Sequence, residues 1–152
     1  MALFKIIHLL AVLIWVGGMF FAYVVLRQAT AEALDPSQRL RLWAAVLHRF
    51  FNWVWAAVGI ILITGFYLIY LYGGIAHVSR HVHAMLALGL VMMLIHGYIF
   101  FTCYVPFSLH VAKKRWKEAG ESLDKIRKLV AVNLVLGLLT VGVVLIGGMV
   151  RM

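Results

Sequence analysis

The sequence predicts an all-α membrane protein, a bundle of four transmembrane helices that forms a single domain over residues 1–152. Of the 152 residues, 65% are hydrophobic and only 12% are charged, whereas a soluble domain contains about 25% charged residues. Four long runs carry no Lys, Arg, Asp or Glu: residues 6–26, 50–79, 81–112 and 129–150. A helix of about 20 apolar residues spans a bilayer core, and no run shows the two-residue alternation of a membrane β-barrel.

The first run, residues 6–26, lies between Lys5 and Arg27 and is predicted to be a retained transmembrane helix. The small residues on either side of Thr30 resemble a signal-peptide cleavage site. However, the run is longer than the apolar region of a signal peptide, which has about 7–15 residues. We therefore expect this segment to span the membrane.

The second helix is predicted to begin near Pro36 and to enter the membrane near Arg49. Asp35 is a suitable N-cap, proline is favoured at the first helical position, and Gln38 completes a capping pattern. The residues between Pro36 and Arg49 should then form an amphipathic extension of this helix on one side of the membrane.

The third helix, built on residues 81–112, is predicted to continue past the bilayer to about Ala119. Gly120 is a suitable stop because glycine is favoured just after a helix end, and Pro106 is expected to bend the helix. Helices 2 and 3 would then both extend on the same side. The fourth helix corresponds to the run 129–150.

Basic residues predict the orientation of the bundle. The net charge of +9 comes from bases that cluster at the ends of the apolar runs, which indicates contact with the lipid bilayer and not with nucleic acid. One side carries only Lys5, Arg80 and Arg151. The positive-inside rule therefore places both long loops in the cytoplasm and both termini in the periplasm of a bacterial inner-membrane protein. The bases of the two loops are Arg27, Arg39, Arg41, Arg49, Lys113, Lys114, Arg115, Lys117, Lys125, Arg127 and Lys128.

The candidate cofactor site begins with two histidines at matching depth. His8 and His83 each lie three residues inside a flanking base, about 5 Å below it on the outer side. Two imidazoles at one depth on different helices fit bis-histidine ligation of a haem; the alternative is a pair of interfacial histidines. Trp15 lies two turns from His8 on the same face and could line a flat ring. Arg49 and Arg80 could pair with haem propionates, or simply reach lipid phosphate.

A second pair of candidate metal ligands lies deeper in the bundle. His96 is 13 residues beyond His83, about 20 Å along the same helix, and is close in depth to His48. Helix rotation argues against two cofactor sites on one face of this helix, because His83 and His96 should face directions about 140° apart. His48 has an alternative role as an interfacial residue.

Copper is the alternative metal. His77, His81 and Met85 lie near His83, and methionine is a soft ligand suited to copper. Met92 and Met93 follow on the same helix, although methionine is also common core filler. All five acidic residues fall in the loops: Glu32, Asp35, Glu118, Glu121 and Asp124. A carboxylate-based proton pump or a hydrolase is therefore not predicted.

Several short motifs resemble the CopD-type copper resistance membrane domain. They are the run HLLAVLIWVGG over residues 8–18, the pair Arg49-Phe50 at the start of helix 2, and Thr64-Gly65 within it. This resemblance covers most of the chain and implies a copper-handling membrane protein.

The chain also resembles the HemJ-type protoporphyrinogen oxidases, which share its four-helix layout. The helix 1 histidine with a tryptophan seven residues on corresponds to His8 and Trp15, and the helix 3 histidines correspond to His83 and His96. The resemblance implies that His8 binds haem b. An arginine and a lysine of that family are replaced here by Val24 and Met85, which argues against the oxidase activity itself.

From these observations the leading hypothesis is a haem b protein with His8 and His83 as axial ligands near the periplasmic face. It would transfer electrons between a quinone or another redox membrane protein and a periplasmic acceptor. One alternative is a copper-handling transporter that uses His8, His77, His81, His83 and Met85. Another is a non-catalytic structural subunit. A homodimer through the glycine-bearing helix faces is left open.

Overall fold

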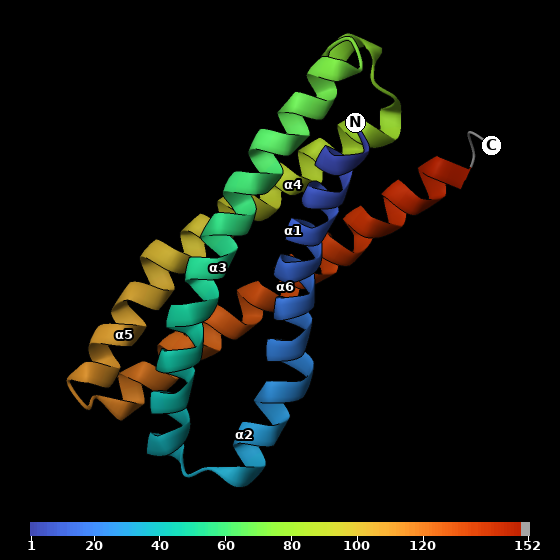
Figure 1. Ribbon diagram of the computed structural model, residues 1–152. Helices are drawn as coiled ribbons and strands as arrows, with labels where there is room; N and C mark the ends of the chain where they lie inside the picture. The colour runs from blue at the N-terminus through green and yellow to red at the C-terminus, as the bar shows by residue number, and fades with distance from the viewer. Residues whose placement is uncertain (150–152) are drawn as a thin grey trace.

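The computed structural model describes residues 1–149, and four long helical segments run through them (Figure 1). Each is long and apolar enough to cross a membrane. Residues 150–152, which include Arg151 and the end of the predicted fourth run, lie outside the described residues. The first segment joins α1 (Ala2–Phe20), the π-helical η1 (Phe21–Leu26) and α2 (Arg27–Ala33). The others are α3 (Pro36–Leu71), then α4 (Arg80–Tyr98) with the π-helical η3 (Ile99–Tyr104) and α5 (Val105–Ala112), and α6 (Trp116–Met149).

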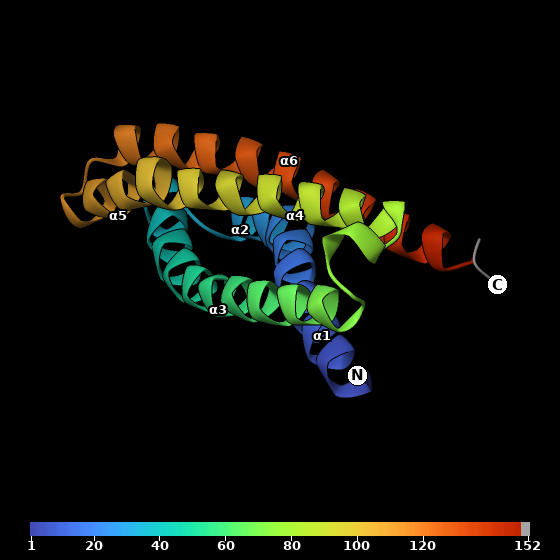
Figure 2. The same cartoon turned by 90° about the horizontal axis from the view of Figure 1, so that it is seen from above.

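The segments pack as two crossed pairs. α1 lies along α3, whereas α4 and α5 lie along α6. Seen from above, the α4–α6 pair forms one layer and the α1–α3 pair the other (Figure 2). The layers meet where α6 contacts α1 and α3 and where α3 contacts α5. All four segments therefore contribute side chains to the interior.

The two ends of the bundle differ in the chain termini and helix connections that they carry. The start of α1, the end of α6 and the α3–α4 connection lie at one end, which is at the top of Figure 1. The α2–α3 and α5–α6 turns lie at the other end. The connection between α3 and α4 includes the short 3₁₀ helix η2 (Ile75–His77). This arrangement matches the four crossings expected from the apolar runs; the assignment of the ends to periplasm and cytoplasm stays a prediction.

Two clusters of buried side chains form the core. One lies toward the α2–α3 and α5–α6 turns and includes Trp43, Phe51, Tyr104 and Phe107. The other lies nearer the middle and includes Trp15, Val54, Met92 and Leu134. By contrast, large apolar side chains such as Leu13, Ile63 and Leu94 are 68–75% exposed. An exposed apolar surface of this extent is typical of helices that face lipid.

The start of α3 confirms the predicted boundary but not the predicted capping pattern, because no side chain makes a cap hydrogen bond there. The helix begins at Pro36, Asp35 is the N-cap residue, and its carbonyl accepts a hydrogen bond from the Arg39 amide at 2.8 Å. Proline suits this position because its missing N–H would have no partner in the first turn. The amphipathic extension before Arg49 is thus part of one continuous helix.

The predicted end of the third helix is wrong. The helix stops at Ala112, and Gly120 lies inside α6. The Arg115 amide donates to the His110 carbonyl at 2.9 Å and the Lys114 amide to the Val111 carbonyl at 3.1 Å, which is the Schellman pattern of a helix C-terminus. Lys114 takes the left-handed position with φ 55°. Because glycine usually occupies that position, the sequence carries no obvious signal for this stop.

A π-helical stretch, η3, ends two residues before Pro106 on the third segment. Proline has no N–H, and its ring clashes with the carbonyl four residues earlier, which disturbs regular α-helical bonding. The sequence predicts an irregularity at this position, but not its π-helical form. The second π-helical stretch, η1, was not predicted.

Candidate functional site

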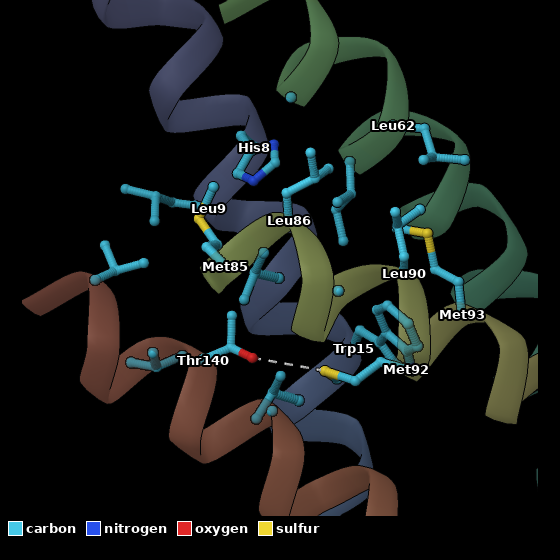
Figure 3. Close-up of a pocket in the computed structure, with 18 of the residues that line it drawn as sticks. His8, Leu9, Trp15, Leu62, Met85, Leu86, Leu90, Met92, Met93 and Thr140 are labelled. Carbon is cyan, nitrogen blue, oxygen red and sulfur yellow. Dashed lines mark hydrogen bonds between the residues drawn. The ribbon is translucent and has the colours of Figure 1, made fainter. Parts of the chain in front are cut away.

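A cavity of about 170 Å³ lies inside the bundle, between the central core cluster and the end that holds the termini. Residues of α1, α3, α4 and α6 line it, and Figure 3 shows them converging on the same space. Nearly all of these residues are apolar; the polar groups in the lining are the side chains of His8 and Thr140 and the indole of Trp15. A polar group in such a setting is a candidate ligand for a bound ion or molecule.

His8 is held in the cavity wall by Thr64 on the neighbouring helix α3. The distance from His8 Nδ1 to Thr64 Oγ1 is 2.8 Å. The Thr64 hydroxyl has a single proton and donates it to the Ile60 carbonyl at 2.6 Å, so it must accept a hydrogen bond from His8 Nδ1–H. The proton is then on Nδ1, and Nε2 keeps its lone pair. A histidine oriented in this way is prepared to bind a metal through Nε2.

Gly65 provides the room that the imidazole needs. A Cβ atom added at Gly65 would lie 3.3 Å from Cε1 of His8, which is tighter than an ordinary van der Waals contact. Thr64 and Gly65 thus act together, because one fixes the ring by a hydrogen bond and the other leaves space beside it. The sequence motif contains both residues as a pair, but it does not predict their contact with His8.

Three methionines of α4 share the cavity with His8. They are Met85, Met92 and Met93, and Figure 3 shows their side chains around the same space. Met92 is 3% exposed, and its sulfur lies 3.9 Å from the Thr140 hydroxyl. Thioether sulfur and imidazole nitrogen are ligands that suit monovalent copper. The cavity therefore offers soft ligands in an apolar surrounding.

His83 does not line the cavity. Its side chain is exposed, and its Nδ1 lies 3.1 Å from the Ser79 carbonyl oxygen on its own helix. Arg80 is also exposed. The two histidines proposed as axial ligands therefore lie in different surroundings. His8 lines the cavity, whereas His83 is exposed. The cavity is also smaller than the roughly 300–1,000 Å³ of pockets that hold drug-sized ligands.

His96 is the deepest of the histidines, at 3% exposure. Its ring packs among the aromatic rings of Trp15, Phe51 and Trp55, at centroid distances of 5.7, 5.2 and 5.0 Å. The contrast with the exposed His83 agrees with the rotation expected for 13 helical positions. Trp15 belongs both to this group and to the cavity lining.

His48 and Arg49 lie elsewhere on α3. His48 Nδ1 is 3.3 Å from the Tyr104 hydroxyl, so His48 and His96 have different neighbours. Arg49 is exposed and lies 15 positions before Thr64, about 22 Å along the helix. To contact a group bound beside His8, the Arg49 side chain would have to span that distance.

His77 of the α3–α4 connection and His81 at the start of α4 also differ in their partners. His77 Nδ1 is 2.8 Å from the Gly73 carbonyl, and His81 is 3.0 Å from the Ser79 hydroxyl. Among residues 1–149 there is no group of three or more His, Cys, Asp or Glu side chains arranged to hold a metal.

Comparison with known families shows what this chain is similar to. The family model described as copper resistance protein D matches residues 44–146, which is 103 of the 152 residues. The matched region covers most of α3 and all of α4 and α5, and it reaches far into α6; it leaves out α1 with His8 and Trp15. No curated protein and no solved structure matches the chain significantly.

Proposed function

Because the chain belongs to the copper resistance protein D family, we propose that it handles copper in the membrane and binds Cu(I) in the cavity beside His8. It is a multi-pass protein of the bacterial inner membrane with four spanning helices. Copper is the cargo in this proposal. The main observation in support of this proposal is that His8 and three methionines line one apolar cavity.

The lining favours a soft, singly charged ion. Thioether and imidazole groups prefer Cu(I) over hard cations, which need oxygen ligands. The lining contains no carboxylate, so a doubly charged ion would remain poorly compensated in a surrounding of low dielectric constant. The Nε2 atom of His8 would serve as the nitrogen ligand, with Met85, Met92 and Met93 as the available sulfur ligands.

The position of the cavity suggests where copper enters. It lies toward the end of the bundle that holds the termini, which the positive-inside rule assigns to the periplasm. Copper would then reach His8 from the periplasmic side. A transporter and a periplasm-facing copper store both fit this geometry, and transport across the membrane requires a further site on the path.

Metal analysis of the purified protein tests this proposal against the haem b hypothesis. We expect copper without iron, and at least one copper ion per chain fewer in His8→Ala but not in His110→Ala, whose imidazole lies beside Ser122. A haem Soret band that disappears in His8→Ala would instead support haem b and overturn the copper proposal. A protein that binds neither metal would favour the structural-subunit alternative.

A further inference from the structure

The aromatic group around His96 has the features of a second binding site. The ring of His96 contacts Trp15, Phe51 and Trp55 and is almost fully buried. Within residues 1–149, no hydrogen-bond partner meets its buried Nε2 atom. Buried polar atoms in proteins nearly always have a partner. The unpaired nitrogen therefore points to a ligand that binds there.

The neighbouring rings favour a cation as that ligand. Tryptophan is the aromatic side chain that attracts cations most strongly, and the attraction grows where water is excluded. Trp15 and Trp55 both meet the His96 ring in an edge arrangement, with interplanar angles of 74° and 67°. No Asp or Glu lies in residues 6–26, 50–79, 81–112 or 129–149, so a single positive charge suits this environment better than two.

The aromatic group around His96 is adjacent to the cavity that His8 lines. Trp15 lines that cavity and also packs against His96. Met92 lines the cavity as well and is four positions before His96 on α4, so the two side chains lie on the same helix face. Met85, Met92 and His96 thus form a stripe along the inner face of α4, with His96 about 16 Å beyond Met85.

We propose that His96, with the indoles of Trp15 and Trp55, forms a second Cu(I) site that receives the ion from the His8 cavity. This inference rests on the proposed function and adds a step to it. The ion would pass from the cavity past Met92 to the imidazole nitrogen of His96, beside the two indole rings. No electron or proton changes hands in this step, since the ion stays Cu(I) and Nε2 supplies a lone pair.

The test is an anaerobic titration of the full-length protein in detergent with Cu(I). Copper per chain is measured after desalting, and tryptophan emission is recorded during the titration. We expect the wild type to bind two Cu(I) ions, with the second quenching the emission because it lies against two indoles. His96→Leu should bind one ion and lose that quenching phase. His110→Leu, the matched control, should bind two.

The outcomes separate this inference from the proposed function. A His96→Leu variant that still binds two ions, or a wild type whose single ion is lost in His8→Ala, would overturn the second site and leave the first in place. A wild type that binds no Cu(I) would reject both. If His96→Leu does not fold, Trp55→Leu replaces it. This variant should bind the second Cu(I) ion about tenfold more weakly or worse and keep its affinity for the first. Unchanged binding of both ions would overturn the second site.

Discussion

The imidazole of His8 is bonded through Nδ1 to the Thr64 hydroxyl at 2.8 Å, which joins α1 to α3 in the wall of the cavity. The partner of one ring nitrogen determines the role of the other. Because Thr64 uses its own proton on the Ile60 carbonyl, Nε2 is the atom left to bind a ligand. Copper binding should therefore depend on Thr64 even though this residue does not line the cavity.

Thr64→Val tests this dependence. The substitution keeps the side-chain shape and removes the acceptor, so the ring loses its preferred tautomer and orientation. We expect Cu(I) affinity to fall by about 10- to 100-fold, the usual effect of losing such a supporting bond. Thr64→Ser should restore most of it. Thr102→Val is the matched control, since Thr102 also donates to the carbonyl four residues earlier but is exposed. Equal affinity in Thr64→Val and the wild type would contradict the role of this bond.

Gly65→Ala should impair copper binding by displacing the His8 ring. The added Cβ would meet Cε1 at 3.3 Å, whereas a Cβ at Gly59 on the same helix meets nothing within 4 Å. Alanine is the better helix former at both positions by about 1 kcal/mol. Gly59→Ala should thus bind copper normally, and Gly65→Ala should bind it several-fold more weakly. Copper titration of both variants checks this, and indistinguishable curves would argue against a fixed ring position.

Gly137→Ala should destabilise the fold. Its Cβ would lie 2.9 Å from a methyl of Val16 and 3.1 Å from Cε of Met92, so α6 could not approach α1 and α4 as it does. Overpacking of this kind costs about 1–3 kcal/mol. Thermal unfolding in detergent should show a lower midpoint than the wild type. Gly142→Ala, where a Cβ meets nothing within 4 Å, should not lower it; a similar drop in both variants would mean that helix packing at Gly137 is not the cause.

Lys114→Gly should stabilise the α5–α6 turn. Lys114 has φ 55°, a conformation that costs an L-residue about 1–2 kcal/mol and that glycine adopts freely. Part of the gain is offset by the greater freedom of glycine in the unfolded chain, so we expect a net stabilisation of up to about 1 kcal/mol in the same unfolding assay. Lys113→Gly, at a residue with φ −85°, should give no such gain. A loss of stability in Lys114→Gly would contradict the Schellman turn.

The fold was largely predictable from the sequence because the membrane imposes simple lengths. Uncharged runs marked the four spans, and the Asp35-Pro36 signal marked the start of α3. The end of α5 was not predictable, because a lysine occupies the position where glycine normally marks the stop. Gly120 carried the expected signal but lies within α6.

The site was only partly predictable because depth along a helix does not determine which way a side chain faces. His8, Trp15 and Met85 were singled out, and all three line the cavity. His83 matched His8 in depth, yet its side chain is exposed. The aromatic neighbours Phe51 and Trp55 of His96 come from α3, and the register of α3 against α4 cannot be read from a single sequence.

The most direct test of the central claim is X-ray absorption spectroscopy of the Cu(I)-loaded His96→Leu variant in detergent, in which the cavity beside His8 is the one proposed site left, compared with the double variant His8→Ala/His96→Leu. With one Cu(I) per chain, we predict for His96→Leu a first shell of sulfur together with the outer-shell scattering of one imidazole. In the double variant the imidazole signal should disappear. A shell of oxygen and nitrogen without sulfur, or an imidazole signal that persists in the double variant, would contradict copper binding in the cavity beside His8.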